Sequence, residues 1–112
     1  MPTIAALDGF ALGGGLEIAM SACLRTASNE AKMGLTETKL AIIPGAGGTQ
    51  NLTRLVGLAK AKELMYTARM IQGVEAERIG LVNKSVPQNE SNDAAYQAAL
   101  ALAEEIQSGI CI

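Results

Sequence analysis

Three consecutive glycines followed by a nearly uncharged segment constrain this chain more than any other feature. The glycines occupy positions 13–15 and lead into residues 16–23, where Glu17 is the only charge. Because this segment is apolar on nearly every side, we predict a short helix in the interior of the fold. The sequence thus predicts a buried helix with an isolated carboxylate near its start.

Both the glutamate and the glycines have two interpretations. A carboxylate in apolar surroundings is costly to bury unless it is bonded, paired or protonated, and such placement is typical of acid/base catalysis. The alternative is a structural glutamate bonded to nearby backbone. The glycines can present N–H groups to the oxygen of a polarised carbonyl, or they can merely let a helix pack tightly against a strand. The phosphate-binding patterns GxxxxGK[ST] and GxGxxG are absent.

Composition excludes several classes of function. The 112 residues allow one domain at most, and the net charge of −2 offers no basic field for RNA or anionic lipid. We recognise no apolar run of membrane-spanning length and no signal or transit segment, and we expect no membrane contact. The core must be built from aliphatic residues and methionine, since aromatic residues make up only 3%.

Histidine is absent, which removes Ser-His-Asp and Cys-His nucleophile activation together with imidazole metal ligands. Cys23 and Cys111 have no CxxC partners, so we expect neither a metal site nor a disulfide framework. We interpret Cys23 as a small core residue. Any catalysis here must rest on carboxylates, backbone donors or lysine.

Hydrophobic periodicity and turn residues predict alternating strands and helices, which favours the α/β class. Asp93 is expected to cap the last helix and Gly80 to end the helix before it. We expect strands at 3–7, 24–27, 32–34 and 81–86, and helices at 16–23, about 49–56, 59–66, 73–79 and 94–106.

A second glutamate, Glu37, follows Glu17 by twenty residues and precedes a glycine-rich turn at 44–48. Alone, Glu37 is typical of a surface carboxylate. Paired with Glu17, it would supply the second carboxylate that addition or removal of water needs, although spacing alone does not bring the two together.

These segments together resemble the enoyl-CoA hydratase/isomerase (crotonase) superfamily over residues 2 to about 106. Residues 11–17 and 32–37 match its central signature with both glutamates in register, and residues 42–50 match the next block. The resemblance implies that the whole chain, 1–112, is the central part of one such domain. The implied fold is a partial crotonase (ClpP/crotonase-like) ββα spiral of the α/β class, truncated at both ends. Residues 61–64, 88–90 and 93–96 are most similar to two mitochondrial members of the family.

Carried over residue by residue, the resemblance implies four roles. The Gly14 N–H donates to the thioester oxygen in an oxyanion hole, Glu17 and Glu37 are catalytic and hold the reacting water between them, and Gly45 helps to fix that water. The implied reaction adds water across the double bond of a 2-enoyl-CoA thioester, in fatty-acid or branched-chain amino-acid catabolism. No cofactor and no metal is implied, because coenzyme A is part of the substrate. The implied full-length protein is mitochondrial and a homo-oligomer, either a trimer or a hexamer.

Length leaves two alternatives open. A full crotonase enzyme is more than twice as long, and the resemblance implies that the missing first half supplies a second oxyanion donor and most coenzyme A contacts. The chain can therefore be a catalytically inactive truncated isoform, or a module that binds RNA or a partner subunit, with the missing basic patch arguing against RNA. We expect strand 3–7 and helix 16–23 to expose apolar faces in the isolated chain.

Overall fold

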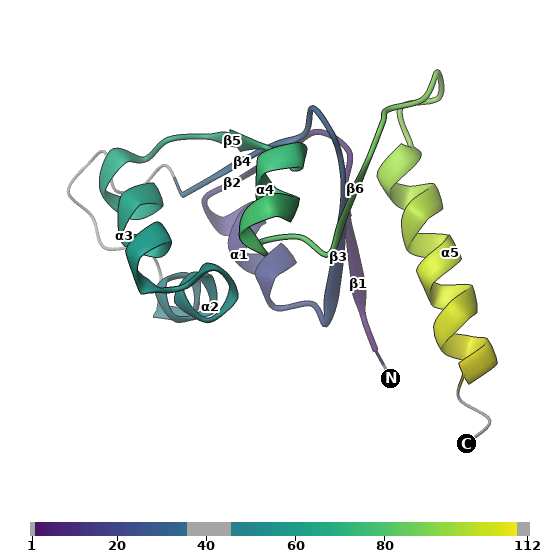
Figure 1. Ribbon diagram of the computed structural model, residues 1–112, viewed down its shortest axis with the longest axis horizontal. Coiled ribbons are helices and arrows are strands. Elements are labelled where there is room, and N and C mark those ends of the chain that lie inside the picture. Colours follow the sequence, from purple (N-terminus) through teal and green to yellow (C-terminus); the bar gives the residue numbers. More distant parts are fainter. Residues whose placement is uncertain (1, 36–45, 110–112) are drawn as a thin grey trace.

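The computed structural model describes residues 2–35 and 46–109, which alternate between short strands and helices (Figure 1). The elements follow one another as β1 Ile4–Leu7, β2 Phe10–Leu12, α1 Gly14–Met20, β3 Leu24–Ser28, β4 Lys32–Gly34, α2 Ala46–Val56, α3 Leu58–Thr67, β5 Ile71–Gln72, α4 Gly73–Ile79, β6 Lys84–Val86 and α5 Ala94–Gly109. The chain is therefore of the α/β class, as the sequence predicted.

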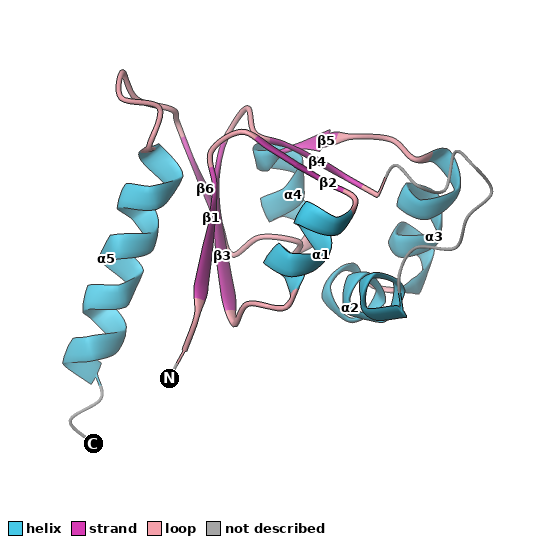
Figure 2. Ribbon diagram, turned by 180° about the vertical axis from the view of Figure 1, so that it is seen from behind, coloured by secondary structure: helices cyan, strands magenta, loops and turns pink. Residues whose placement is uncertain are grey.

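The strands form two small sheets. In the first, the order is β1-β3-β6 and both pairings are parallel; in the second, β2 pairs with β4 in parallel and β4 with β5 in antiparallel orientation. Helix α5 packs against the first sheet, and α1 and α4 lie on the other side of it (Figures 1 and 2). Helices α2 and α3 pack on each other, and α2 also contacts α1. The first part of the chain thus places α1 between the first sheet and the pair α2–α3.

The core is aliphatic and rich in methionine, as the composition predicted. Register aligns Ala11, Met33 and Ile71 across the second sheet, and all three side chains are buried. Leu16 of α1 and Leu35 after β4 are almost fully buried in the same cluster. Each such leucine contributes about 1.5–3 kcal/mol relative to an exposed one. Helix α1 is therefore held by burial along one side.

The rest of the α1 surface is not buried. Leu16, Ala19 and Met20 are buried, whereas Ile18 is 75% exposed and Phe10, just before the helix, is 73% exposed. The prediction of a helix in the interior of the fold therefore holds for one side of α1 only. The expectation that this segment exposes apolar surface is confirmed by the same residue, Ile18.

Helix α4 was predicted most closely. It spans Gly73–Ile79, and Gly80 follows it in the left-handed conformation with φ of 93°. The strand predicted at 81–86 begins only at Lys84, because the N–H groups of Leu81 and Val82 donate to the Ala76 carbonyl at 2.8 and 3.3 Å. These two residues therefore complete the end of α4 instead of pairing with β3. The short strands β2 and β5 were not predicted.

The capping of α5 differs from the prediction. The Asp8 carboxylate, in the turn between β1 and β2, accepts the Ala95 N–H at 2.8 Å and the Tyr96 N–H at 3.2 Å. Asp93 instead accepts a hydrogen bond from the Asn89 side chain at 2.8 Å. The Ala95 and Tyr96 donors are thus satisfied by a residue near the other end of the chain, whereas the Ala94 N–H donates to Gln88 Oε1 at 2.9 Å. None of the helices in the described ranges has the length and apolar character needed to cross a membrane.

Cys23 also departs from its prediction as a core residue. It lies between α1 and β3 and is exposed, and its N–H donates to Thr3 Oγ1 at 3.1 Å. A backbone hydrogen bond from Thr3, supported by the Thr3 hydroxyl, lowers the pKa of the Cys23 thiol. Nearby apolar residues are covered to a greater extent: Met20 is buried and Leu24 is half-buried, whereas Cys23 faces solvent.

Candidate active site

The turn from β2 into α1 depends on Gly13. Its φ of 53° and ψ of −122° lie in a region that side chains rarely allow, and its N–H donates to the Gly34 carbonyl at 2.9 Å. That bond joins the start of α1 to the end of β4. Gly13 therefore fixes both the direction in which α1 begins and its position beside the second sheet.

Tight packing does not explain the other two glycines within the described residues. A Cβ added at Gly14 or Gly15 would have no described atom within 4 Å, and both positions are exposed. Helix geometry leaves the first-turn N–H groups without an intrahelical acceptor. The backbone at Gly14 is thus accessible to an oxygen atom from outside the described chain. This is the property that the oxyanion interpretation requires.

Glu17 lies one turn into the same helix. Its N–H donates to the Gly13 carbonyl at 3.0 Å, and its side chain is half-buried beside the buried Leu16. No residue in the ranges 2–35 and 46–109 forms a hydrogen bond or an ion pair with the Glu17 carboxylate. The alternative of a structural glutamate bonded to nearby backbone thus finds no support in this part of the chain. Gly14 and Glu17 lie on one helix, α1, which begins two residues before the predicted start at residue 16 and ends at Met20 instead of residue 23.

Glu37 and Gly45 lie outside the described residues, so the predicted approach of Glu37 to Glu17 stays a prediction. The residues that flank this segment are described. Leu35 is 1% exposed in the core, one residue after the Gly34 carbonyl that binds Gly13. Helix α2, which begins at Ala46, packs against α1. Both flanks therefore belong to elements next to α1.

Sequence reasoning missed one residue at the far end of α1. Arg25 is only 4% exposed, and its guanidinium donates to main-chain carbonyls, at 2.8 Å to Leu81 and 2.7 Å to Ala22. Burial lowers the pKa of this guanidinium below its ordinary value. The available signal was a single charge inside the strand Leu24–Ser28, which is otherwise uncharged. A buried arginine shortly after a helix indicates that it binds the helix's last carbonyls.

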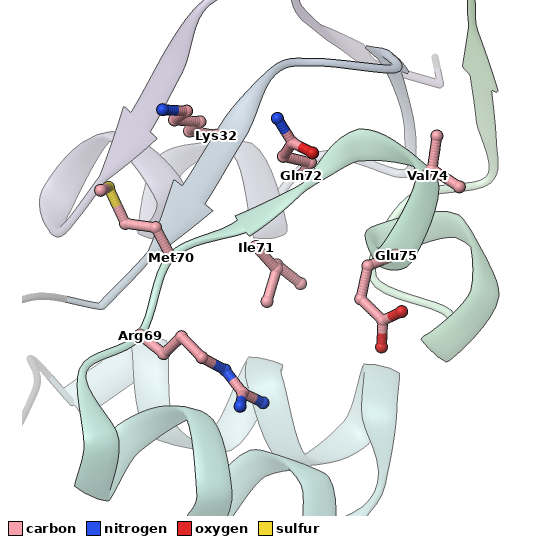
Figure 3. A pocket seen from close by; sticks show the side chains of 7 residues that line it. All are labelled: Lys32, Arg69, Met70, Ile71, Gln72, Val74 and Glu75. Carbon is pink, nitrogen blue, oxygen red and sulfur yellow. The ribbon is translucent and has the colours of Figure 1, made fainter.

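A separate hollow of about 720 Å³ lies along β5 and the start of α4 (Figure 3). Arg69 and Glu75 line it, but Arg69 is paired with Glu63 and Glu75 with Arg78. Hydrogen bonds from Lys60 and then Arg69 lower the pKa of Glu63, and the hydrogen bond from Arg78 lowers the pKa of Glu75. Neither Gly14 nor Glu17 lines this hollow, and the Arg69 and Glu75 side chains that line it form surface ion pairs. Across the described ranges, no cluster of three or more acidic, cysteine or histidine side chains is arranged to hold a metal ion.

The fold of the chain superposes on parts of longer solved structures. The enoyl-CoA hydratase of Bacillus anthracis superposes with a TM-score of 0.88 at 50% identity, over 96% of this chain and 40% of that one. The P. aeruginosa protein DspI superposes with a TM-score of 0.85 at 40% identity, over 94% of this chain and 41% of that one. The fold is therefore that of the crotonase class, present here as a partial domain.

The family follows from the sequence matches. The profile of the enoyl-CoA hydratase/isomerase family matches residues 1–110, and the chain belongs to that family. Human mitochondrial enoyl-CoA hydratase domain-containing protein 2 is 61% identical over 105 residues, which are 94% of this chain and 36% of that protein. Rat mitochondrial methylglutaconyl-CoA hydratase is 58% identical over 105 residues, 94% of this chain and 33% of that protein. These are the two mitochondrial relatives that the short segments indicated, and the chain spans about a third of their length.

Proposed function

We propose that this chain is the central part of an enoyl-CoA hydratase, which adds water across the double bond of a 2-enoyl-CoA thioester. The observation that carries the proposal is the first turn of α1, where the accessible Gly14 backbone and the Glu17 carboxylate lie together. Membership of the family supports the reaction class. Two relatives named as mitochondrial support a mitochondrial location, in fatty-acid or branched-chain amino-acid catabolism.

In the proposed mechanism, Glu17 and Glu37 hold one water molecule, and Gly45 helps to orient it. One carboxylate removes a proton as the water oxygen bonds to the β-carbon, and the other delivers a proton to the α-carbon. Electron density moves onto the thioester oxygen, where the Gly14 N–H stabilises it. A preformed backbone donor costs no reorganisation as the charge develops, which is why it lowers the barrier. The coenzyme A moiety is bound as part of the substrate, and no further cofactor is required.

The isolated chain should be inactive. Removing one oxyanion donor typically costs about 10²–10³-fold in rate, and the second donor is expected in the part of the family domain that this chain lacks. The exposed side chains of Phe10 and Ile18 should also make the isolated chain aggregate or require a partner. Size-exclusion chromatography with thermal unfolding tests this. A monomer with a reversible two-state transition would contradict it.

The proposal is best tested in a chimera. This chain's family segment replaces the matching 105 residues of human methylglutaconyl-CoA hydratase, which is 57% identical over them. The chimera should hydrate a short 2-enoyl-CoA, measured as loss of enoyl-thioester absorbance. Glu17→Gln and Glu37→Gln keep the side-chain shape but remove the acid/base group, so each should lower kcat by about 10²–10⁴-fold.

The matched control is Glu75→Gln, which changes a surface glutamate paired with Arg78 far from α1 along the chain. It should leave kcat unchanged. Substrate KM should change little in the Glu17 and Glu37 variants, because backbone donors and coenzyme A contacts hold the thioester. A folded chimera without hydratase activity, or one whose activity survives both substitutions, would overturn the proposed function.

A further inference from the structure

Arg25 presents an unusual charge in the interior of the described chain. It is 4% exposed, and none of the carboxylates in the described ranges lies within ion-pair distance of it. A buried cation without a carboxylate partner is costly unless other groups replace its hydration. The role of the buried Arg25 therefore follows from the acceptors that replace water around its guanidinium.

Those acceptors are carbonyl groups at the end of α1, in the residues just after it, and at Leu81. Nη1 donates to Ala22 at 2.7 Å, to Met20 at 3.4 Å and to Ala19 at 3.5 Å. Nε donates to the Leu81 carbonyl at 2.8 Å, just after α4. The last carbonyls of a helix lack intrahelical donors and carry its negative end, so a guanidinium there satisfies both needs. Arg25 thus ties the end of α1 to the segment that follows α4.

The backbone of Arg25 is itself firmly placed. Arg25 lies in β3, the central strand of the first sheet, between β1 and β6. Its N–H donates to Asn83 Oδ1 at 2.8 Å, and its carbonyl accepts the Asn83 N–H at 2.9 Å. The guanidinium therefore extends from a rigid strand to a short helix, and the strand sets the helix position.

We propose that Arg25 is a positioning residue for the hydration reaction, because its guanidinium fixes the end of the helix that carries Gly14 and Glu17. This inference rests on the proposed function. Helix α1 has seven residues and is about 10 Å long. It is held at one end by the Gly13–Gly34 hydrogen bond and at the other by Arg25. Releasing the second end tilts the first turn, and a displacement of about 1 Å in a catalytic group can cost about 10²-fold in rate.

The test uses the chimera and two substitutions of one residue. Arg25→Met keeps a long side chain but removes all donors, and should lower kcat by about 10²-fold while KM stays within about threefold. Arg25→Lys keeps the charge, but one ammonium cannot reproduce the fork that reaches both Leu81 and α1. It should therefore recover part of the activity and remain about tenfold below the parent. Hydrogen exchange at the 14–24 amides should quicken in both variants, with the amides of α5 unchanged.

The matched control is Arg78→Met, which removes a surface arginine bonded only to Glu75 and should leave kcat unchanged. If Arg25→Met fails to fold, Arg25→Lys decides the question. Parent-level kcat in a folded variant, whatever its melting temperature, would make Arg25 structural and overturn this inference alone. An inactive chimera with Arg25 intact would reject the proposed function, and the positioning role with it.

Discussion

Replacing Gly73 with alanine should force α4 away from β3. A Cβ at Gly73 would lie 2.0 Å from the Ser28 carbonyl oxygen, 2.9 Å from the Ser28 carbonyl carbon and 3.3 Å from the Asn29 Cα. All three are backbone atoms, so no side chain can turn aside to make room. Non-bonded carbon atoms are most stable about 3.5–4.0 Å apart. Even with the smaller radius of oxygen, the two backbones must separate by more than about 1 Å to reach a normal contact.

The cost follows from that displacement. Overpacking a well-packed interior typically costs about 1–3 kcal/mol, and contact between two backbones belongs at the upper end of that range. The separation would also break the hydrogen bond from the Val74 N–H to the Asn29 carbonyl, 3.4 Å long, worth about 0.5–1.5 kcal/mol. We therefore expect a loss of about 3 kcal/mol or more. The human protein has about 340 residues, because 105 residues are 31% of it. At about 2.1 cal/mol/K of unfolding entropy per residue, each kcal/mol lowers the melting temperature by about 1.4 °C, so the chimera should lose about 4 °C or more.

The measurement is thermal unfolding of the chimera followed by circular dichroism, and Gly15→Ala is the matched control. Position 15 is exposed, no described atom lies within 4 Å of an added Cβ, and alanine favours helix over glycine by about 1 kcal/mol. Its melting temperature should stay the same or rise. If Gly73→Ala melts at the same temperature as Gly15→Ala, α4 does not meet β3 as closely as this reasoning requires.

Three further substitutions in the chimera should change its stability in defined ways. Asp8→Ala removes the acceptor of the Ala95 N–H, so it should cost about 0.5–2 kcal/mol in chemical denaturation and quicken hydrogen exchange at the start of α5. Gly80→Ala places a side chain at φ of 93°, with its Cβ 3.0 Å from a backbone oxygen, and should lower the melting temperature by a few degrees, at about 1.4 °C per kcal/mol. Hydrogen bonds from the Ser85 N–H and hydroxyl hold the pKa of Glu77 below its ordinary 4.5, so Glu77 stabilises the fold above that pH and the benefit is lost as pH falls through the lowered pKa. The difference in unfolding free energy between Glu77→Gln and the parent should therefore shrink as the pH falls. A difference that stays constant from pH 7 to pH 3 would contradict a stabilising role of the Glu77 carboxylate.

The parts of the fold that the sequence predicted have local signals. Helix α4 begins and ends with glycine, and the left-handed residue Gly80 sets its last turn. Strand β1 is a short apolar run followed by the turn residues Asp8 and Gly9, and it too was predicted. For the candidate site, the glycines and Glu17 fall in one contiguous segment, so a helix that carries Glu17 could be predicted from residues 13–23, although it begins earlier than predicted, at Gly14.

The parts that the sequence did not predict depend on distant partners. The Asp8 cap of α5 joins residues 87 positions apart, and the bond from Arg25 to Leu81 spans 56. No local pattern around Asp93 shows that the Asp8 carboxylate, and not Asp93, accepts the N–H groups at the start of α5. Strand β5 has only two residues and exists because Ile71 and Gln72 pair with β4. Cys23 was misassigned because an apolar neighbourhood in sequence does not say which residue of a helix-to-strand connection faces water.

The cap of α5 by Asp8 has a consequence for the order of events during synthesis. The turn between β1 and β2 emerges from the ribosome first, whereas its partners at Ala95 and Tyr96 are added 87 and 88 residues later. At about 5–20 residues per second, Asp8 waits roughly 4–18 s before the first turn of α5 exists. During that interval the face of the first sheet that α5 covers is open to other molecules. Completing this contact is thus a late step, and a ribosome that pauses between α4 and α5 would prolong the period in which the sheet can associate wrongly.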